Sequence, residues 1–209
     1  MKLVLASNNA KKLAELQTLF AGLPIELVNQ GALGIIEAEE PHATFVENAL
    51  AKARHAARAS GMAAIADDSG LCVAALGGAP GVQSAHYADA VAGNADREAR
   101  RRAQDAANNA LLLERMHGVA ERPARFVCTL VALRHADDPE PLIVHGRWDA
   151  LLLTRPRGQG GFGYDPLVWI ESLGASVAEL SATQKNALSH RSLAAAQMRG
   201  LMREAWQLA

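Results

Sequence analysis

Strand-like and helix-like stretches alternate along this chain of 209 residues, and that alternation is the feature that most restricts its fold. Short apolar runs at 2–6 and 63–66 are typical of buried strands. Two longer stretches, 125–134 and 142–153, are typical of strands joined by the acidic turn at 137–139. Such alternation favours helices packed against a sheet, so we expect an α/β fold without internal repeats or a clear linker. A chain of this length suits one domain, or one domain of two lobes.

Two helices are predicted between the first two of these strands. Asn9 is the expected N-cap of the first helix, which places Leu13, Leu16 and Phe20 on one face. The second helix begins at Thr44, which matches the Ser/Thr-x-x-Glu pattern of a capping box with Glu47, and extends to about Ser60. Its expected inward positions are Phe45, Ala49, Ala53 and Ala56.

Two further helices are predicted in the rest of the chain. One spans 89–116 and carries several arginines in its first half, with acidic residues between them. That interleaving favours a solvated helix face over a nucleic-acid contact. Ser189 is the expected N-cap of the last helix, in which four residues recur at intervals of four: Leu193, Gln197, Leu201 and Ala205.

The formal net charge of −1 excludes an overall field that would attract nucleic acid or an anionic membrane. No apolar stretch of the sequence approaches the roughly 20 residues of a membrane-spanning helix. Cys72 and Cys128 lie in apolar runs, where buried thiols in a reducing compartment are the usual state. We therefore expect a cytoplasmic protein that binds neither nucleic acid nor a membrane, in which any phosphate site is local.

Adjacent carboxylates at Asp67 and Asp68, followed by Ser69 and Gly70, are the strongest sign of chemistry. They come where a buried strand is expected to end, and two like charges there are costly unless a cation or hydrogen-bond donors compensate them. Oxygen ligands of this kind suit Mg²⁺, which commonly binds together with phosphates. For these four residues alone, an Asx turn at a strand end is an equally good interpretation.

Small polar residues occupy the junction between the first strand and the first helix. Backbone N–H groups at a helix N-terminus can bind phosphate, and a nearby lysine supplies the opposite charge. The junction lacks the glycines of a P-loop, and by itself it is better explained as an ordinary helix cap. The candidate phosphate-binding residues are Ser7, Asn8, Asn9, Ala10, Lys11 and Lys12.

The second predicted helix offers Asn48 and Lys52, which are four residues apart and therefore share one face. Glu39 and Glu40 precede this helix and suit either an exposed loop or an additional metal ligand. Taken singly, each of these four side chains is better explained by contact with solvent.

The glycine-rich segment at 158–166 favours ligand binding. Its glycines allow positive φ and close approach of the backbone to a ligand. Phe162 and Tyr164 offer flat faces on which a base can stack, and Asp165 adds a fixed acceptor. A flexible loop would not normally need two aromatics and an Asp-Pro ending. A second Gly/Pro loop at 77–81 is better interpreted as structural.

Side chains that donate hydrogen bonds surround the start of the last helix, at Lys185, His190 and Arg191. Such donors suit carbonyl oxygens or phosphates. A capped helix with exposed charges explains them comparably well.

Together these segments resemble the inosine triphosphate pyrophosphatases, a family that hydrolyses non-standard purine nucleoside triphosphates. The resemblance rests on SNNAKK, EEPHATFVENALAKA, ADDSGL, GGAPGVQSAHYA, GQGGFGYDP and KNALSHR, which occur in the family's order between residues 7 and 191. Lys11 departs from the pattern, because many members have glycine before the lysine that corresponds to Lys12. The helix near 96–109 matches no motif of the family.

The resemblance implies a single nucleoside triphosphate pyrophosphatase domain over residues 1–209. The implied fold is α/β and elongated, with two lobes around a curved mixed β-sheet and an active-site cleft between the lobes. The implied reaction is Mg²⁺-dependent hydrolysis of ITP, dITP and XTP to the monophosphate and pyrophosphate, which removes them from the nucleotide pool. A purine nucleoside triphosphate would be the substrate, and the protein would be a homodimer.

The resemblance also implies a role for each candidate residue. Asp68 would be the catalytic base and a metal ligand, while Glu40 and Asp67 would bind the metal or support it. The residues implied to hold the triphosphate and the rest of the nucleotide are Ser7, Asn8, Asn9, Ala10, Lys11, Lys12, Asn48, Lys52, Ser69, Phe162, Gly163, Tyr164, Asp165, Lys185, His190 and Arg191.

Two other classes of function stay open beside this one. A regulatory module would bind a nucleotide without hydrolysing it, and the intact carboxylates and lysines argue against that class. A phosphatase with an aspartyl nucleophile would need a different arrangement of carboxylates and would release orthophosphate.

Overall fold

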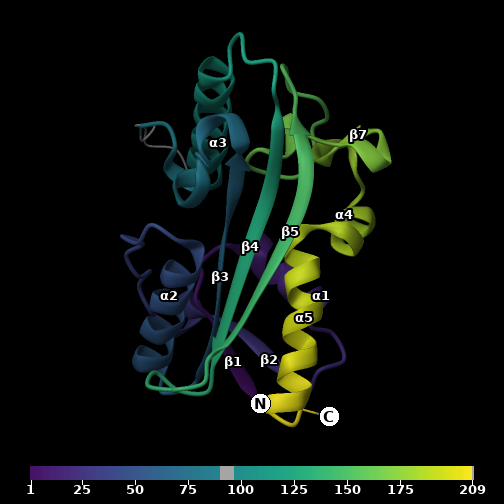
Figure 1. The fold of residues 1–209 in the computed structure, drawn as a ribbon. Helices are drawn as coiled ribbons and strands as arrows, with labels where there is room; N and C mark the ends of the chain where they lie inside the picture. The colour runs from purple at the N-terminus through teal and green to yellow at the C-terminus, as the bar shows by residue number, and fades with distance from the viewer. Residues whose placement is uncertain (90–96, 209) are drawn as a thin grey trace. The chain divides into compact units, whose positions relative to one another are not determined.

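The computed structural model describes residues 1–89 and 97–208, and its centre is a seven-stranded sheet with the strand order β2-β1-β3-β4-β5-β6-β7 (Figure 1). Strand β1 pairs in parallel with β2 and β3, whereas β6 pairs antiparallel with β5 and β7. The predicted α/β fold with a mixed sheet is therefore confirmed.

The described residues contain the predicted strands and helices, together with short elements at 26–29, 168–170, 175–176 and 182–188 that the sequence pattern did not predict. The strands are β1 (Lys2–Leu5), β2 (Glu26–Asn29), β3 (Ala63–Val73), β4 (Pro123–Leu133), β5 (Leu142–Leu152), β6 (Val168–Ile170) and β7 (Ala175–Ser176). The helices are α1 (Ala10–Leu19), α2 (Phe45–Ser60), α3 (Arg97–Arg115), α4 (Ala182–Leu188) and α5 (His190–Ala205). No helix in the described ranges is both long enough and apolar enough to cross a membrane.

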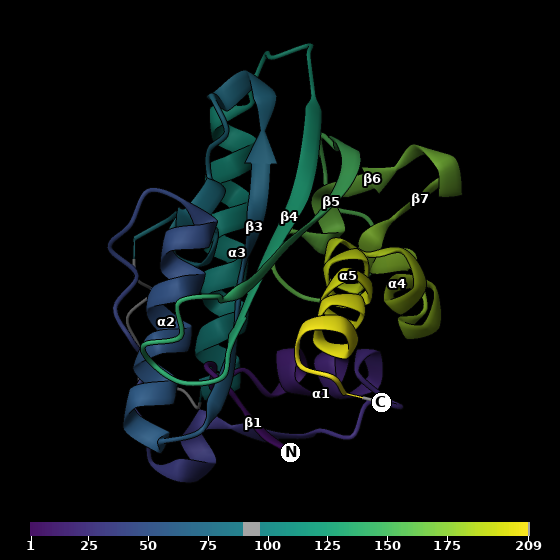
Figure 2. The same cartoon turned by 60° about the horizontal axis from the view of Figure 1, so that its bottom comes forward.

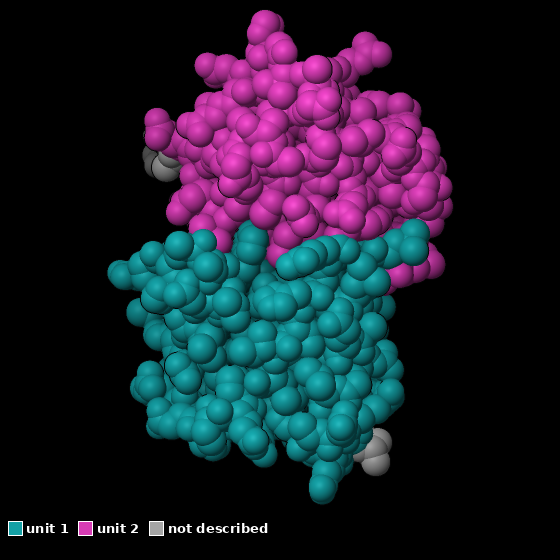
Figure 3. Space-filling view, viewed as in Figure 1, with its two compact units in different colours: residues 1–68, 128–147, 188–209 teal, residues 69–127, 148–187 magenta. Residues whose placement is uncertain are grey.

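The chain forms two compact units, coloured separately in Figure 3. Unit 1 consists of residues 1–68, 128–147 and 188–209, and unit 2 consists of 69–127 and 148–187. Strands β3, β4 and β5 contribute residues to both units. The cleft between two lobes and the single domain over 1–209 stay predictions.

Unit 1 packs helices on both faces of its strands, with α2 on one side and α1 and α5 on the other (Figures 1 and 2). Side chains alternate along a strand, so β1 sends Leu3 and Leu5 into the core beside α1 and α5 and sends Val4 into the core beside α2. The α2 core is built from small side chains, as the predicted inward alanines Ala49, Ala53 and Ala56 confirm. Phe45, also predicted inward, is half-buried.

Unit 2 has its own apolar core. Leu112 of α3 and Met116, which directly follows α3, pack with Leu71 and Val73 of β3, and Tyr164 of the glycine-rich segment joins the same cluster. The segment is therefore anchored to the core of unit 2 by one of its two predicted aromatics.

Strand β3 is longer than predicted, because it continues through Asp67 and Asp68 to Val73 instead of ending at residue 66. An Asx turn at these residues is therefore wrong. Cationic side chains contact both carboxylates there, which offsets the cost of burying two like charges.

The structure shows which faces of two predicted helices are buried. In α5 the buried residues include Ala194, Ala195, Met198 and Met202, whereas the row Leu193, Gln197, Leu201 and Ala205 is exposed or half-buried. The arginines Arg100, Arg101 and Arg102 of α3 are exposed, as a solvated face requires, while residues 90–96 of the predicted 89–116 helix lie outside the described residues.

Candidate active site

The two carboxylates of β3 point to opposite faces of the sheet in unit 1. Asp67 lies on the side of α1 and α5, where it contacts Lys12 and Arg191, and Asp68 lies on the side of α2, where it contacts Lys52. This is the alternation expected of neighbours in a strand. The two carboxylates therefore have different cationic partners.

Asp67 is completely buried and receives hydrogen bonds from three side chains. The Lys12 ammonium lies 2.6 Å from Oδ1, while the Arg191 Nε donates to Oδ2 at 2.7 Å. The Cys128 thiol also donates to Oδ2, at 3.3 Å. Burial by itself raises the pKa of Asp67, but Arg191 and Lys12 hold it well below its usual value. Asp67 is therefore an ionised anchor for two cations.

Arg191 is the charged residue at the centre of this side of unit 1. It follows the Ser189 N-cap at the start of α5, and its side chain is only 2% exposed. Its Nη1 donates to Glu15 of α1 while its Nε donates to Asp67, so the guanidinium joins two carboxylates. Burial lowers the pKa of Arg191, but the two carboxylates raise it above its usual value. The implied contact of Arg191 with the nucleotide base stays a prediction.

On the opposite side, Asp68 and Glu40 share the ammonium of Lys52. Its Nζ lies 2.7 Å from Asp68 Oδ1 and 3.1 Å from Glu40 Oε2. Burial raises the pKa of Asp68 to about 6, against the opposing effect of Lys52 and with a further contribution from Glu40. In the described part of the chain, Asp68 Oδ2 is buried and has no hydrogen-bond partner. A carboxylate with this pKa and an unused oxygen can accept a proton near neutral pH.

Asn48 and Lys52 of α2 are buried, although solvent was the better explanation from sequence. The Asn48 amide accepts a hydrogen bond from the His42 backbone N–H and donates to the His42 carbonyl. These bonds hold the segment that precedes α2, which carries Glu40. The Thr44 N-cap is confirmed, but only half of the capping box forms, since Glu47 bonds to the Thr44 hydroxyl instead of its backbone N–H.

The junction between β1 and α1 forms the predicted helix cap. The Asn9 side chain accepts hydrogen bonds from the N–H groups of Lys11 and Lys12, and Ser7 Oγ accepts one from the Asn9 N–H. Asn8 donates its backbone N–H to Glu37, and among the described residues its buried Oδ1 has no hydrogen-bond partner. Ala10 and Lys11 are exposed, so this turn presents backbone and lysine groups beside a pre-formed cap.

The carboxylate oxygens of Asp68 and Glu40 fit as ligands of Mg²⁺ that is bound together with phosphates. Within the residues that the structure describes, no cluster of three or more His, Cys, Asp or Glu side chains is able to hold a metal ion. Mg²⁺ does not need such a cluster, because one or two carboxylates, water and substrate phosphates complete its octahedron. Asp68, with its unused oxygen, and the partly exposed Glu40 are the matching pair. Both oxygens of Asp67 are already occupied, which favours a supporting role.

The predicted residues of unit 2 form a separate cluster. Asp165 accepts hydrogen bonds from the Lys185 ammonium at 2.7 Å and from the Phe162 N–H at 2.9 Å. The Lys185 ammonium lies 4.4 Å from the centre of the Phe162 ring. The Tyr164 hydroxyl donates to the Ser84 carbonyl at 2.9 Å. These contacts tie the Phe162 backbone and ring, and the Tyr164 hydroxyl, to neighbouring residues of unit 2.

Ser69 and His190 complete the predicted set. Ser69 follows Asp68 in β3 and is half-buried. His190 is the first residue of α5 and is buried. Their predicted contacts with a nucleotide stay predictions.

Sequence reasoning missed several residues that contact the predicted ones. Glu15 carries no local sign of its role, because it bonds to Arg191, 176 positions later in the chain. Cys128 carries none either, because its contact with Asp67 depends on the pairing of distant strands. Asp105 and Asn109 of α3, which bond to Gly163, carry no local sign of that role.

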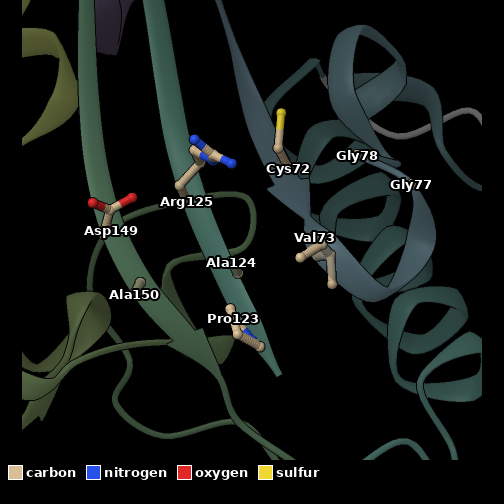
Figure 4. Close-up of a pocket in the computed structure, with 10 residues that line it drawn as sticks. Cys72, Val73, Gly77, Gly78, Pro123, Ala124, Arg125, Asp149 and Ala150 are labelled. Atoms are coloured by element: carbon tan, nitrogen blue, oxygen red, sulfur yellow. The ribbon is translucent and has the colours of Figure 1, made fainter. Parts of the chain in front are cut away.

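A hollow of about 500 Å³ in unit 2 contains none of the predicted site residues (Figure 4). Its lining includes Cys72, Arg125 and Asp149, together with Gly77 and Gly78 of the second Gly/Pro loop. The hollow is therefore distinct from the clusters described above.

Comparisons with known proteins agree over nearly the whole chain. The family model of the Ham1 family matches residues 3–201. The chain is 70% identical to a dITP/XTP pyrophosphatase of Methylibium petroleiphilum, over 99% of each chain, and 68% identical to one of Leptothrix cholodnii, over 100% of each. It also resembles the solved structure of a HAM1 protein from Coxiella burnetii, with 42% identity, a TM-score of 0.86 and coverage of 98% of this chain and 99% of that one.

Proposed function

The chain belongs to the Ham1 family, and from that premise we propose that it is an enzyme that hydrolyses dITP, XTP and ITP to the monophosphate and pyrophosphate. The two relatives named above are dITP/XTP pyrophosphatases and match the chain from end to end. The observation that carries the proposal is the buried pair Asp68 and Lys52, in which Asp68 keeps an oxygen without a partner in the described structure. Hydrolysis of these triphosphates would remove them from the nucleotide pool.

In this proposal Asp68 is the base. Attack of water on a phosphoryl group requires an oriented nucleophile and a group that takes its proton. The raised pKa of Asp68, about 6, matches that task better than an ordinary aspartate would. Lys12 and Lys52 would offset the negative charge of the triphosphate. The backbone around the Asn9 cap would bind phosphate oxygens through N–H groups.

We further propose that Asp68 and Glu40 hold Mg²⁺, with Asp67 as their support. When bound, the ion would neutralise phosphate charge and polarise the phosphoryl group that is attacked. Asp67 would act from the other face of β3, where it holds Lys12.

Selectivity for the base follows from hydrogen bonding. Hypoxanthine and xanthine carry a 6-oxo group where adenine carries an amine, so donors aimed at that oxygen would go unpaired with ATP. One such lost contact costs about 1–3 kcal/mol. His190, Arg191 and the half-buried ring of Phe162 are the proposed contributors, whereas Tyr164, predicted as a second stacking surface, is buried in the core of unit 2 and would only anchor the segment. Rejection of GTP would have to come from the 2-amino position.

The resemblance also supports a homodimer and a cytoplasmic location, and we propose both. Size-exclusion chromatography with light scattering would test the dimer. A monomer at micromolar concentration would contradict it.

The decisive assay measures kcat/KM for XTP, dITP, ITP, GTP and ATP, with product identification and one arm without Mg²⁺. We expect pyrophosphate from the first three, and activity that depends on Mg²⁺. Orthophosphate would favour the phosphatase class, and tight binding without product would favour a regulatory module. Asp68→Asn should lower kcat by at least about 10²-fold while nucleotide binding survives. Asp137→Asn, the same change at a side chain that is 88% exposed, should retain full activity.

A further inference from the structure

Helix α3 matches no motif of the resemblance, yet two of its side chains hold the backbone of the glycine-rich segment in unit 2. The Asp105 carboxylate accepts a hydrogen bond from the Gly163 N–H at 2.9 Å. The Asn109 amide donates one to the Gly163 carbonyl at 3.0 Å. Asp105 and Asn109 are four residues apart and share one face of the helix. One helix therefore fixes both polar backbone groups of a single residue.

Gly163 is a position where such fixing matters. It lies between Phe162 and Tyr164, and its φ of +60° falls in the left-handed region that favours glycine. Glycine also reaches many other conformations, so its own backbone does not determine where the neighbouring rings point. The two bonds from α3 restrict that freedom.

The residues on either side of Gly163 are anchored separately. The Tyr164 hydroxyl bonds to the Ser84 carbonyl, and Tyr164 is buried in the core of unit 2. Phe162 is held through its N–H by Asp165 and contacts Lys185 through its ring. Gly163 joins these two anchors, and its position therefore sets where the Phe162 ring lies relative to the buried Tyr164.

We propose that Asp105 and Asn109 are positioning residues that set the affinity for the nucleotide base by holding Gly163. The inference rests on the proposed function, because it takes the half-buried Phe162 ring as the base-binding surface. Neither residue needs to touch the substrate, since both act through the backbone between the two rings.

A neighbouring residue separates this role from general stabilisation of α3. Asn108 is buried and bonds to the carbonyls of Ser84 and Ala85 and to the Ala88 N–H. It therefore fastens α3 to the 84–88 segment. Asp105 and Asn109 are only half-buried, and they bond to Gly163. Asn108→Ala is accordingly the matched control for lost packing.

The test compares the double variant Asp105→Ala/Asn109→Ala with the wild type, using ITP and, as a competitive inhibitor without a base, inorganic tripolyphosphate. Loss of two hydrogen bonds should raise KM for ITP about 10-fold. The value of kcat and the inhibition constant for tripolyphosphate should not change, because neither depends on the base-binding surface. The single variant Asp105→Asn should keep a near-normal KM for ITP, since its amide oxygen can accept the same hydrogen bond from the Gly163 N–H. Asn108→Ala should lower Tm and leave KM unaltered.

The proposal is overturned if KM for ITP and the tripolyphosphate constant rise together, or if neither changes in a folded double variant. It is also overturned if Asn108→Ala raises KM as much as the double variant does. A wild-type protein that releases no pyrophosphate from ITP would contradict the proposed function instead. Calorimetric titration with IMP then tests the positioning role directly: about 10-fold weaker binding by the double variant supports it, whereas equal binding, or none by the wild type, overturns it.

Discussion

Removal of the Arg191 guanidinium should destabilise the protein severely, because the buried Asp67 carboxylate then loses one of its two cationic partners. We consider Arg191→Met, which keeps an unbranched apolar side chain and deletes the charge. Arg191 is 2% exposed and Asp67 is 0% exposed, so water cannot replace the lost donor. Breaking a buried ion pair by removing one partner costs about 3–5 kcal/mol.

The structure places the expected loss in the lower half of that range. Lys12 still contacts Asp67 at 2.6 Å, and the Glu15 carboxylate, 20% exposed, can regain water. We therefore expect the free energy of unfolding to fall by about 3–4 kcal/mol. In a domain of this size that corresponds to a Tm lower by roughly 6–16 °C.

The assay is urea unfolding at pH 7, followed by circular dichroism, for the wild type, Arg191→Met, Asp67→Asn and the double variant. The double variant should be more stable than Arg191→Met, because it no longer buries an undercompensated charge. The effect should persist in 1 M NaCl, since salt screens buried pairs weakly. The reasoning would be refuted if Arg191→Met lowered the free energy of unfolding by less than about 1 kcal/mol. It would also be refuted if the change in the double variant equalled the sum of the two single changes.

Three further predictions follow from other parts of unit 1. In metal-free protein, folding raises the pKa of Asp68 from 3.8 to about 6, so the folded state binds an extra proton between these pH values. The free energy of unfolding should therefore fall as pH rises through that window. Urea titrations in which the free energy of unfolding changes equally with pH for the wild type and Asp68→Asn would contradict this. A Cβ at Gly146 would lie 1.8 Å from the His190 carbonyl oxygen, so Gly146→Ala should lower the free energy of unfolding by at least about 2 kcal/mol. Gly200 lies in open space on α5, so the control Gly200→Ala should raise the free energy of unfolding by about 0.5–1 kcal/mol. Similar melting curves for the two variants would show that the close approach at Gly146 is absent. Asp138, buried in the turn after β4, accepts hydrogen bonds from Arg134 and from the Glu140 N–H, and the Arg134 bond holds the pKa of Asp138 below its usual value. Asp138→Asn should therefore be less stable than the wild type at pH 7, and this difference in the free energy of unfolding should shrink as pH falls below about 4. A difference that stays constant with pH would count against the ion pair.

Local hydrogen bonding explains which parts of the fold were predictable from sequence. The N-caps Asn9, Thr44 and Ser189 each bond to N–H groups two or three residues away, so their positions follow from nearby residue types. Strand alternation likewise predicts that Asp67 and Asp68 diverge. These features depend on short stretches of chain and not on the tertiary fold.

The compensation of the carboxylates could not be predicted in the same way. Arg191, which offsets the buried charge of Asp67, lies 124 positions later in the chain, so no local pattern places it there. Lysine at a lone helix position is usually exposed, and Lys52 is buried only because Asp68 and Glu40 converge on it. The buried face of α5 stayed open in the sequence for a related reason: a four-residue period fits several rows of a helix, and packing selects the row of Ala194 and Met198.

The composition of unit 1 from three separate stretches has a consequence for synthesis on the ribosome. Asp67 emerges early, whereas Arg191 belongs to the final stretch, 188–209. Until that stretch is released, the nascent chain can pair Asp67 with Lys12 but not with its guanidinium partner. Domains generally fold as units during translation. The first 68 residues must therefore stay unfolded until residues 188–209 are released, or fold with the Asp67 charge only partly compensated. Nascent chains stalled before residue 188 should accordingly be cleaved by protease within 1–68, and full-length chains should resist.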